Sequence, residues 1–585
     1  MKENKVVALI VKFLTVILLM AVAIFLFSVA PYYKPTETFE RGVMHFVVDD
    51  KDVTNSLPAP VYVQDDVVMI SDKTAMKYFD NIYVYYDEKY DTAIITSEKK
   101  VGKIKLGENT ITINGEEQAL KGTATFKMIE KTSDEESAME KTLYIPISSI
   151  KDITDVDFVY NKKVIATTLR GYSRLKIVEL ASTHKLKAYK KEIALTTGVA
   201  KKGELLYVFD TEEKELTDYL VVRNERGDIG YCQYQRINAS DIMKSTQKID
   251  EMAKYKNLVD KVKYTLVWEY AQNVTPNRNG ETKIDRLQYI SPTWIEVKNK
   301  DADIVTTIDS DYINWAKGQN YKLWPTLKND FISMDNMDDL SAIMTDMQLR
   351  EKLINNVVKV ALQYGFDGIN LDFENMYKAD KDVFSQFVRE FSSTLRANGL
   401  VSSVDVTIAG GSDTYSLCYD RTAIGKAADY VMLMAYDQYG NWSATAGPVA
   451  SLSWVKANIQ EMLNYENVDK DKLFLCVPFY SRYWVVNSET NEKIRSSAIP
   501  MNQANLYLER YKDNAKWSEE DGQYYIELDQ GNGTTIKIWV ENEEALNKKI
   551  ELVNEFDLAG VAVWRWGYED GNKAWKTIAN TLNLQ

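Results

Sequence analysis

Three polar residues at alternate positions, Asn370, Asp372 and Glu374, carry the clearest chemical signal in the sequence. They lie in an apolar segment that begins at Tyr364, and the side chains of an extended strand alternate between two faces. The three polar side chains therefore share one face. Carboxylates are costly to bury unless an ion or a reaction compensates, so this strand is a candidate site for chemistry. A calcium site and a hydrogen-bonded strand end are the alternatives, but the residue spacing of a helix-loop-helix calcium loop is absent.

The positions of the histidines and cysteines exclude several kinds of catalytic mechanism at this strand. The two histidines, His45 and His184, lie outside the C-terminal two-thirds of the chain, which excludes Ser-His-Asp, Cys-His and histidine-bound metal mechanisms near the acidic strand. Cys232, Cys418 and Cys476 are too few and too scattered for a disulfide framework, so we expect buried free thiols. Carboxylate chemistry without a metal or a cofactor remains.

Length and charge limit the class of protein. The chain has 585 residues, enough for about three to four domains. Its 45% hydrophobic content and its 11 prolines are typical of a globular protein. The net charge of -14 argues against a nucleic-acid partner and leaves uncharged substrates open.

The N-terminal segment is strongly apolar. Residues from Phe13 to Ala30 include no charge, and a run extended to Tyr33 could cross a bilayer about 30 Å thick. Lysines precede this run, so the positive-inside rule places the rest of the chain outside the cell. A cleaved signal peptide is the alternative and would give a secreted protein, but Pro31 argues against cleavage. We therefore predict a cytoplasmic tip and single-pass anchor in the cell membrane over residues 1–35.

Two small β-rich domains are predicted after the anchor. Residues 36–169 contain short β-branched strands and the hairpin signal Asn114-Gly115, and they resemble the small α+β domain named after the N-terminal domain of copper amine oxidases, without a metal. Residues 170–238 resemble a bacterial Src-homology-3-like barrel through a Lys-Lys-Gly-Glu turn and a Gly-x-x-Gly-Tyr hairpin. That resemblance implies cell-wall peptides as partners. Residues 239–262 are polar and are predicted to form a linker helix.

Residues 263–585 have the alternating pattern of a (β/α)8 TIM barrel. Eight apolar runs are separated by helical patterns: 264–268, 287–290, 322–327, 366–373, 400–407, 430–436, 473–479 and 561–564. An apolar stripe before the fourth run, with Gly365 at the C-cap position, indicates the helix that leads into the acidic strand. A hairpin pattern within residues 524–540 indicates a small α+β insertion before the last strand, which we expect to line a substrate groove.

Five motifs in this region resemble glycoside hydrolase family 18. Residues 367–374 match the DGxDxDxE signature with Asn370 in place of the middle Asp. The other four follow in barrel order at residues 291–294, 434–437, 477–482 and 560–565. The resemblance covers residues from about 262 onward and is closest to the branch of spore-cortex and cell-wall N-acetylglucosaminidases that act on peptidoglycan.

The resemblance implies a retaining, substrate-assisted hydrolysis in which the 2-acetamido oxygen of the substrate attacks the anomeric carbon. Glu374 would be the general acid and later the base, and Asp372 would orient the acetamido group and stabilise the oxazolinium ion. Tyr436 would hydrogen-bond the acetamido oxygen, and Trp564 would form the floor under the sugar. A carboxylate two residues away should also raise the pKa of Glu374. Asn370 removes one charge from the row, so we expect an altered pH dependence.

The remaining expectations concern the substrate. Asp437, Tyr480 and Arg482 are expected to line the groove. The acetamido requirement limits the polysaccharide to N-acetylglucosamine-type sugars, as in peptidoglycan, chitin or the chitobiose core of N-glycans, and the anchor favours the cell wall. A catalytically inactive carbohydrate-binding protein and an envelope scaffold are the alternatives. Inactive barrels of this family usually lack the terminal Glu, which is present here.

Overall fold

The computed structural model forms two compact units. One contains Met1–Tyr78 and Thr125–Val259, and the other contains Phe79–Ala124 and Asp260–Gln585. The residues that the structure describes are 11–22, 24, 45–48, 51–79, 81–132, 137–154, 156–160, 164–169, 176–179, 183–187, 196–208, 219–224, 227–233, 263–329 and 334–582.

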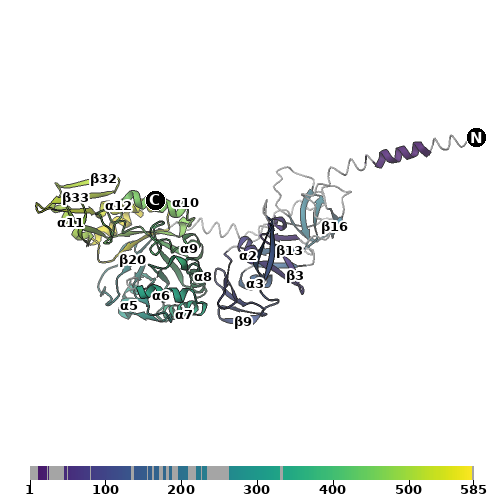
Figure 1. The fold of residues 1–585 in the computed structure, drawn as a ribbon, viewed down its shortest axis with the longest axis horizontal. Helices are drawn as coiled ribbons and strands as arrows, with labels where there is room; N and C mark the ends of the chain where they lie inside the picture. The colour runs from purple at the N-terminus through teal and green to yellow at the C-terminus, as the bar shows by residue number, and fades with distance from the viewer. Residues whose placement is uncertain are drawn as a thin grey trace, which may run out of the picture. The chain divides into compact units, whose positions relative to one another are not determined.

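The C-terminal unit is built on a closed barrel of parallel strands (Figure 1). In barrel order the strands are β20 (Tyr264–Glu269), β21 (Tyr289–Pro292), the two-part strand β24 (Lys322–Leu323) and β25 (Thr326–Lys328), β26 (Gly368–Asp372), β27 (Val401–Thr407), β28 (Tyr430–Met434), β29 (Leu473–Pro478) and β35 (Gly560–Trp564). β35 pairs in parallel with both β29 and β20, which closes the ring. Each predicted apolar run overlaps one of these strands in the same order, so the predicted TIM barrel is confirmed. A short antiparallel pair, β22 (Ile295–Val297) and β23 (Ile304–Thr306), continues the sheet beside β25.

Helices cover the outside of the barrel (Figure 1). They are α5 (Ser310–Gly318), α6 (Met334–Met344), α7 (Met347–Tyr364), α8 (Lys381–Ala397), α9 (Arg421–Ala427), α10 (Leu452–Asn464), α12 (Glu543–Glu555) and α13 (Asn572–Leu582), with 3-10 turns at Lys378–Asp380 and Lys470–Lys472. The helix α7 begins after Asp346, whose carboxylate accepts hydrogen bonds from the backbone N–H groups of Gln348 and Leu349. It ends at Tyr364 and is followed by the C-cap residue Gly365, which has a φ of 63°, so the predicted C-cap is confirmed.

The insertion before the last barrel strand is larger than the predicted hairpin. Its five-stranded antiparallel sheet has the order β31-β30-β34-β33-β32 and is joined by one helix. The elements are β30 (Tyr480–Asn487), β31 (Lys493–Pro500), α11 (Met501–Arg510), β32 (Ala515–Ser518), β33 (Gln523–Asp529) and β34 (Thr534–Val540). The predicted hairpin corresponds to the paired strands β33 and β34. β30 starts two residues after β29 ends, so the insertion grows directly from the seventh barrel strand.

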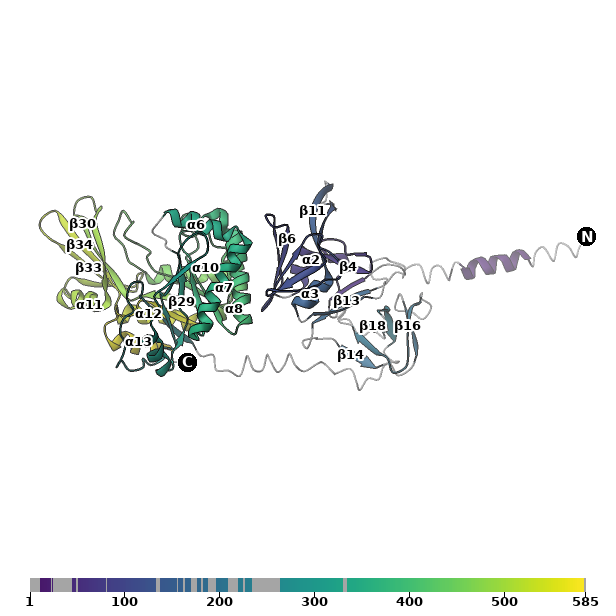
Figure 2. The ribbon, with the colours of Figure 1, turned by 90° about the horizontal axis from the view of Figure 1, so that it is seen from below.

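A five-stranded antiparallel sheet from the N-terminal part of the chain packs on α7 and α8 (Figures 1 and 2). Its strands are β5 (Tyr83–Asp87), β6 (Thr92–Thr96), β7 (Val101–Lys105), β8 (Thr110–Ile113) and β9 (Glu116–Ala119). The guanidinium of Arg350 on α7 is fully buried, donates to both carboxylate oxygens of Glu390 at 3.2 and 3.1 Å, and lies 3.6 Å from the Asp87 carboxylate. The sequence prediction grouped this sheet with residues 36–169, whereas its packing groups it with the barrel.

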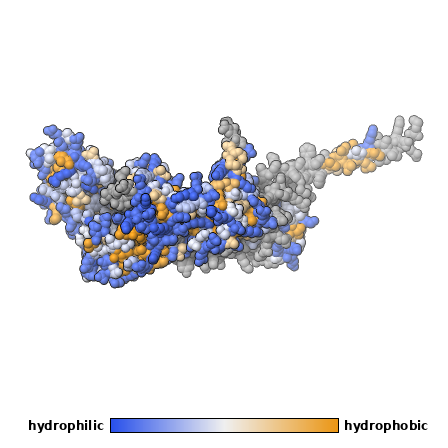
Figure 3. Space-filling view, turned by 60° about the horizontal axis from the view of Figure 1, so that its bottom comes forward, coloured by the Kyte–Doolittle hydropathy of each residue, from blue (hydrophilic) through white to orange (hydrophobic). Residues whose placement is uncertain are grey.

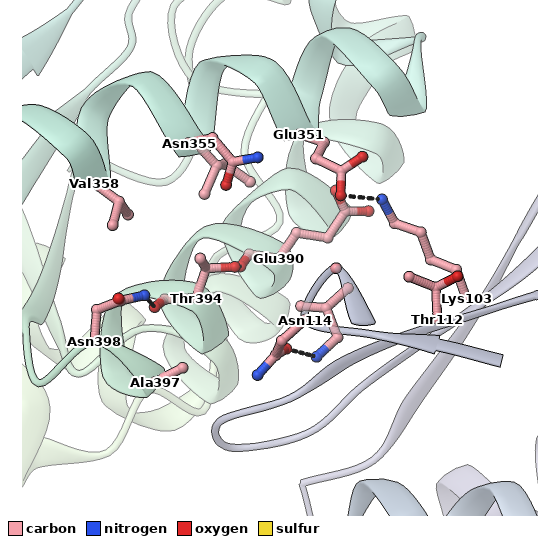
Figure 4. Close-up of a pocket in the computed structure, with 13 residues that line it drawn as sticks. Lys103, Thr112, Asn114, Glu351, Asn355, Val358, Glu390, Thr394, Ala397 and Asn398 are labelled. Carbon is pink, nitrogen blue, oxygen red and sulfur yellow. Dashed lines mark hydrogen bonds and ion pairs between the residues drawn. The ribbon is translucent and has the colours of Figure 1, made fainter. Parts of the chain in front are cut away.

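A pocket of about 390 Å³ lies between this sheet and the two helices (Figure 4). The Lys103 ammonium and the Glu351 carboxylate form an ion pair of 2.9 Å at one end of it. Asn355 of α7 and Asn398 after α8 line it further along. No residue of the acidic strand lines this pocket, so it is separate from the chemistry predicted at the barrel strand ends.

The N-terminal unit is rich in β structure. One sheet has the order β12-β13-β1-β2, a second β10-β11-β4-β3, and a third, six-stranded one β14-β17-β18-β19-β15-β16. The elements are β1 (His45–Val48), β2 (Lys51–Asp52), η3 (Thr54–Ser56), β3 (Tyr62–Gln64), β4 (Val67–Ser71), α2 (Asp72–Tyr78), β10 (Thr125–Thr132), β11 (Ser137–Pro146), α3 (Ile147–Ile153), β12 (Val156–Tyr160), β13 (Val164–Leu169), β14 (Lys176–Glu179), β15 (His184–Lys187), β16 (Thr196–Ala200), β17 (Leu205–Val208), β18 (Tyr219–Asn224) and β19 (Ile229–Gln233). The third sheet falls within residues 170–238, where the Src-homology-3-like resemblance stays a prediction.

The predicted anchor is only partly described. Residues 11–22 are helical and expose large apolar side chains, including Phe13, Leu18 and Leu19 (Figure 3). Within the described part of the chain, no helix is both long enough and apolar enough to span a membrane. Most of the predicted span beyond residue 24, and the whole predicted linker helix at 239–262, lie outside the described residues.

Candidate active site

The predicted site residues lie at the carboxyl ends of the barrel strands, where enzymes with this fold carry their catalytic groups. Asn370 and Asp372 are on β26, Glu374 follows it, Tyr436 and Asp437 follow β28, Tyr480 and Arg482 are on β30 directly after β29, and Trp564 ends β35. The barrel therefore brings residues from a stretch of nearly two hundred positions to one rim.

The strand β26 is held tightly in the barrel wall. A Cβ atom at Gly368 would lie 2.6 Å from the carbonyl oxygen of Val401, so glycine is required for the close approach of β26 and β27. The strand ends at Asp372, two residues before the end of the predicted alternating row. Beyond it, the Asn329 side chain donates to the Glu374 carbonyl oxygen at 2.8 Å and accepts from the Glu374 N–H at 2.9 Å. These two bonds fix the backbone that carries Glu374.

Asn370 is fully buried among the side chains that fill the barrel. Its Oδ1 accepts a hydrogen bond of 2.9 Å from the Trp268 indole N–H, which can only donate. The Nδ2 group therefore faces the other way, where it donates to the Ser403 hydroxyl at 3.1 Å and to Asp405 Oδ1 at 2.6 Å. Asn370 is thus a fixed polar bridge across the barrel interior and does not point into open solvent.

Asp372 is half-buried and has a charged neighbour on the preceding strand. The parallel register places it beside Lys328 of β25, which is buried and ion-paired with Glu296. Burial raises the pKa of Asp372 to about 6, and the positive charge of Lys328 acts in the opposite direction. Among the described residues, the buried Asp372 Oδ1 atom has no hydrogen-bond partner. A buried carboxylate oxygen without a donor is ready to accept one from a ligand.

Glu374 is surrounded by groups that favour its protonated form. Burial raises the pKa of this half-buried side chain well above its ordinary value, and the carboxylates of Asp372 and Asp437 raise it further. A carboxylic acid that keeps its proton near neutral pH can act as a general acid. The predicted rise in the Glu374 pKa thus has burial as its main cause and the neighbouring carboxylate as its second.

The other predicted residues form two groups on the same rim. The Tyr480 hydroxyl donates to Asp437 Oδ1 at 2.8 Å, and the Arg482 guanidinium lies 3.7 Å from the same oxygen. The Trp564 ring lies 6.2 Å from the Trp268 ring, and the peptide bond after Trp564 is cis.

Tyr436 lies close to the acidic row. Burial raises the pKa of its phenol well above the ordinary value, with smaller contributions from Cys476, Tyr480, Asp405 and Asp372. This hydroxyl stays protonated at neutral pH and can donate a hydrogen bond.

Sequence reasoning missed several residues of this site, namely Trp268, Lys328, Asn329 and Asp405. The run 400–407 is predicted as an apolar strand, although Ser403, Asp405 and Thr407 alternate in it as the polar residues of the acidic strand do. That alternation was the available signal for Asp405. The Asn329 contact depends on loop geometry and has no local sequence signal.

The cysteines and the possible metal ligands bear on the predicted chemistry. All three cysteines are buried with free thiols, as predicted. Within the described residues, no three His, Cys, Asp or Glu side chains are grouped so that they could hold a metal ion.

A TIM barrel with carboxylic acids at the carboxyl end of its fourth strand is an arrangement compatible with a glycoside hydrolase. Residues 270–569, more than half of the chain, match the family model of glycosyl hydrolases family 18. The chain therefore belongs to glycoside hydrolase family 18 and is a hydrolase.

Three curated relatives of the chain are proteins of Bacillus subtilis. The chain is 25% identical over 314 residues to the uncharacterized glycosylase YvbX of Bacillus subtilis, which covers 53% of this chain and 89% of YvbX. It is 27% identical over 225 residues to the putative sporulation-specific glycosylase YdhD of B. subtilis, covering 38% of this chain and 52% of YdhD. The cortical fragment-lytic enzyme of B. subtilis is 23% identical over 253 residues, covering 42% of this chain and 57% of that enzyme.

Solved structures of related proteins were also found. The spore cortex-lytic enzyme SleL of Bacillus megaterium is 22% identical, with a TM-score of 0.48 over 55% of this chain and 74% of that chain. A chitinase from Chromobacterium violaceum is 20% identical, with a TM-score of 0.48 over 55% of this chain and 100% of that chain.

Proposed function

We propose that this protein hydrolyses β-1,4 bonds next to N-acetylglucosamine-type sugars in peptidoglycan by a retaining, substrate-assisted mechanism. The proposal rests on two neighbouring groups of the site, an acid that keeps its proton and a carboxylate oxygen that has no hydrogen-bond partner. Glu374 has a raised pKa, and Asp372 Oδ1 has no hydrogen-bond donor within the described residues. An acetamido N–H of the substrate would supply that donor.

The roles follow from this arrangement. Glu374 would transfer its proton to the glycosidic oxygen while the bond from that oxygen to the anomeric carbon breaks, and the 2-acetamido oxygen would form the new bond to that carbon. Asp372 would accept the acetamido N–H and stabilise the positive oxazolinium ion. Glu374, now a carboxylate, would then take a proton from the attacking water. Since the substrate supplies the nucleophile, a second protein carboxylate about 5 Å away is not required.

The remaining rim residues would hold the sugar. Tyr436 keeps its phenol proton and would donate a hydrogen bond to the acetamido oxygen. This bond would hold the nucleophile in position. Trp564 would present an aromatic face to the sugar at the cleavage site. Asp437, fixed by Tyr480 and Arg482, would accept hydrogen bonds from sugar hydroxyl groups.

The substrate and location are supported by the relatives and by the N-terminal sequence. A cortical fragment-lytic enzyme and a putative sporulation-specific glycosylase are among the relatives, which favours peptidoglycan of the spore cortex or cell wall. The uncharged run from Phe13 to Ala30 supports a membrane anchor with the later domains outside the cell. The six-stranded sheet in residues 170–238 would hold wall peptides near the membrane.

A chitinase is the second candidate, since the chain matches probable chitinase 10 of Drosophila melanogaster with 22% identity over 311 residues. An inactive carbohydrate-binding protein is disfavoured by the presence of Glu374 in a site that keeps it protonated. An endo-N-acetylglucosaminidase would use the same site on a different glycan.

Mass spectrometry of the soluble fragments from purified spore cortex, vegetative wall and chitin tests the proposal. We expect muropeptide fragments with a reducing N-acetylglucosamine end from cortex or wall, and none from the same reaction with Glu374→Gln. Release of fragments from chitin alone would show that chitin, and not peptidoglycan, is the substrate. No release from any of the three would leave an inactive binding protein as the better account.

A further inference from the structure

A second buried carboxyl group, Asp405, lies beside the acidic row on the next barrel strand. Asp405 is 2% exposed on β27. The paired residues of the parallel ladder end with Asn370 beside Ser403 and Leu371 beside Val404, and one further step along both strands leads to Asp372 and Asp405. Both side chains point into the barrel, because Asn370 and Ser403 on the same faces of their strands are joined by a hydrogen bond.

The surroundings of Asp405 offer no counter-charge. Among the described residues it has no ion-pair partner, and its hydrogen bond to the Asn370 amide is with a neutral group. The facing titratable groups are all acids: Asp372 and Glu374 from β26 and the loop after it, Tyr436 after β28, and Cys476 on β29. A buried ionised carboxylate without a cation is costly, and an asparagine would make the same hydrogen bond at lower cost. A structural role alone therefore does not require an acid at this position.

Asn370, the hydrogen-bond partner of Asp405, indicates which role an acid at position 405 could have. A neutral amide at position 370 cannot hold or release a proton next to Asp372. The amide orientation is fixed by the Trp268 N–H, so its donor side is the side that faces Asp405. The carboxyl group that the fourth strand lacks is thus present one strand away, at the level of Asp372.

We propose that Asp405 is the proton-sharing partner of Asp372, holding the proton that Asn370 cannot hold. Before the reaction one proton is shared by the two carboxyl groups, because two negative charges on adjacent strands in a buried site repel each other. As positive charge develops on the substrate, that proton moves fully to Asp405 and leaves Asp372 as the carboxylate that faces the oxazolinium ion. The number of protons on the pair does not change. Asp405 is a positioning residue here, and its role rests on the proposed hydrolytic function.

The test moves the carboxyl group from one strand to the other. Asp405→Asn keeps the shape and the hydrogen bond to Asn370 but removes the acid, and Asn370→Asp/Asp405→Asn restores an acid on the other side of Asp372. We expect Asp405→Asn to lower kcat by about tenfold or more with KM within about twofold, as for a group that acts only in the transition state. The double variant should recover kcat to within about threefold of the parent. The acidic limb of the pH profile should move to higher pH in Asp405→Asn. The reason is that Asp372 would then be an isolated buried carboxyl group, which loses its proton at higher pH than a pair of carboxyl groups that share one.

Two results of the kinetic test would overturn the proposal. One is an Asp405→Asn enzyme with the parent kcat and the parent pH profile. The other is a double variant no more active than Asp405→Asn, which would assign Asp405 a structural role. If Asp405→Asn fails to fold, the double variant still decides, because it carries the acid at position 370.

Thermal unfolding separates this proposal from the hydrolytic function itself. Burial and the Asp372 charge raise the pKa of Asp405 well above its ordinary value, so its contribution to stability is present below about pH 3.9 and is lost as the pH rises. Asp405→Asn should therefore have a higher Tm than the parent at pH 7, and the gain should vanish near pH 4. The gain should be smaller in an Asp372→Asn background if the two groups are coupled. Equal gains in both backgrounds would refute the coupling, whether or not the parent hydrolyses any glycan.

Discussion

Replacing Lys328 by methionine should move the acidic limb of the pH profile to higher pH. Lys328 is the cation beside Asp372 in the parallel ladder, and its charge lowers the Asp372 pKa, which stands at about 6. Asp372 must be ionised to stabilise the oxazolinium ion, so activity rises as the pH rises through this value. Without Lys328 the Asp372 carboxyl group keeps its proton to higher pH. The acidic limb of the pH profile therefore moves to higher pH as well.

The size of the shift follows from Coulomb's law. Neighbouring strands are about 4.8 Å apart, so the two charges are roughly 6 Å apart. At an effective dielectric constant of about 20, two unit charges at that distance interact by about 3 kcal/mol, or roughly two pKa units. Glu296 is paired with Lys328 and cancels part of this field. We therefore expect an upward shift of about one unit, from about 6 to about 7.

The assay is kcat/KM between about pH 4.5 and pH 9 on soluble muropeptide or N-acetylglucosamine oligomers. Lys328→Arg keeps the positive charge and should leave the limb in place. Glu296→Gln removes the partner that offsets Lys328 and should move the limb to lower pH. A Lys328→Met enzyme that folds normally and keeps the parent limb would refute the electrostatic account of Asp372.

Three further predictions test other parts of the structure. Asn329→Ala removes both hydrogen bonds to the Glu374 backbone and should lower kcat by about tenfold to a hundredfold with little change in KM; an unchanged kcat would show that the clamp is not needed. Trp564→Ala should lower kcat/KM by about tenfold or more through lost sugar contact, while Trp564→Phe should retain most of it, and equal losses in both would argue against a stacking role. Arg350→Met leaves Glu390 buried without its cation and should destabilise the folded protein by about 3–5 kcal/mol, as measured by urea unfolding; Arg350→Met/Glu390→Leu should be closer to the parent, and a stable single variant would contradict the assigned ion pair.

The barrel could be predicted because its strands carry strong local signals. Parallel strands covered by helices are continuous apolar runs, and each run in the C-terminal region became a strand in the expected order. Gly365 marked the end of α7 because only a residue tolerant of left-handed backbone fits there. The acidic row was visible because three polar residues interrupt such a run at the strand period.

The parts that could not be predicted depend on contacts between distant residues. The sheet β5–β9 packs on α7 and α8 through pairs such as Arg350 with Asp87, more than 250 positions apart, and no local pattern encodes such a contact. The strands β30 and β31 were missed because Tyr480–Asn487 continues the seventh barrel strand almost without a break. The alternation of Ser403, Asp405 and Thr407 marked a polar face on β27, but the contact of Asp405 with Asn370 joins two different strands and has no local pattern.

The central claim is that Glu374 donates the proton that cleaves the glycosidic bond. The most direct measurement is the initial rate of reducing-end release from purified peptidoglycan by the parent and by Glu374→Gln, with equal folding checked by circular dichroism. The account predicts release by the parent and a rate at least about a hundredfold lower for the variant, the usual contribution of a general acid. Release by Glu374→Gln at the parent rate would contradict it.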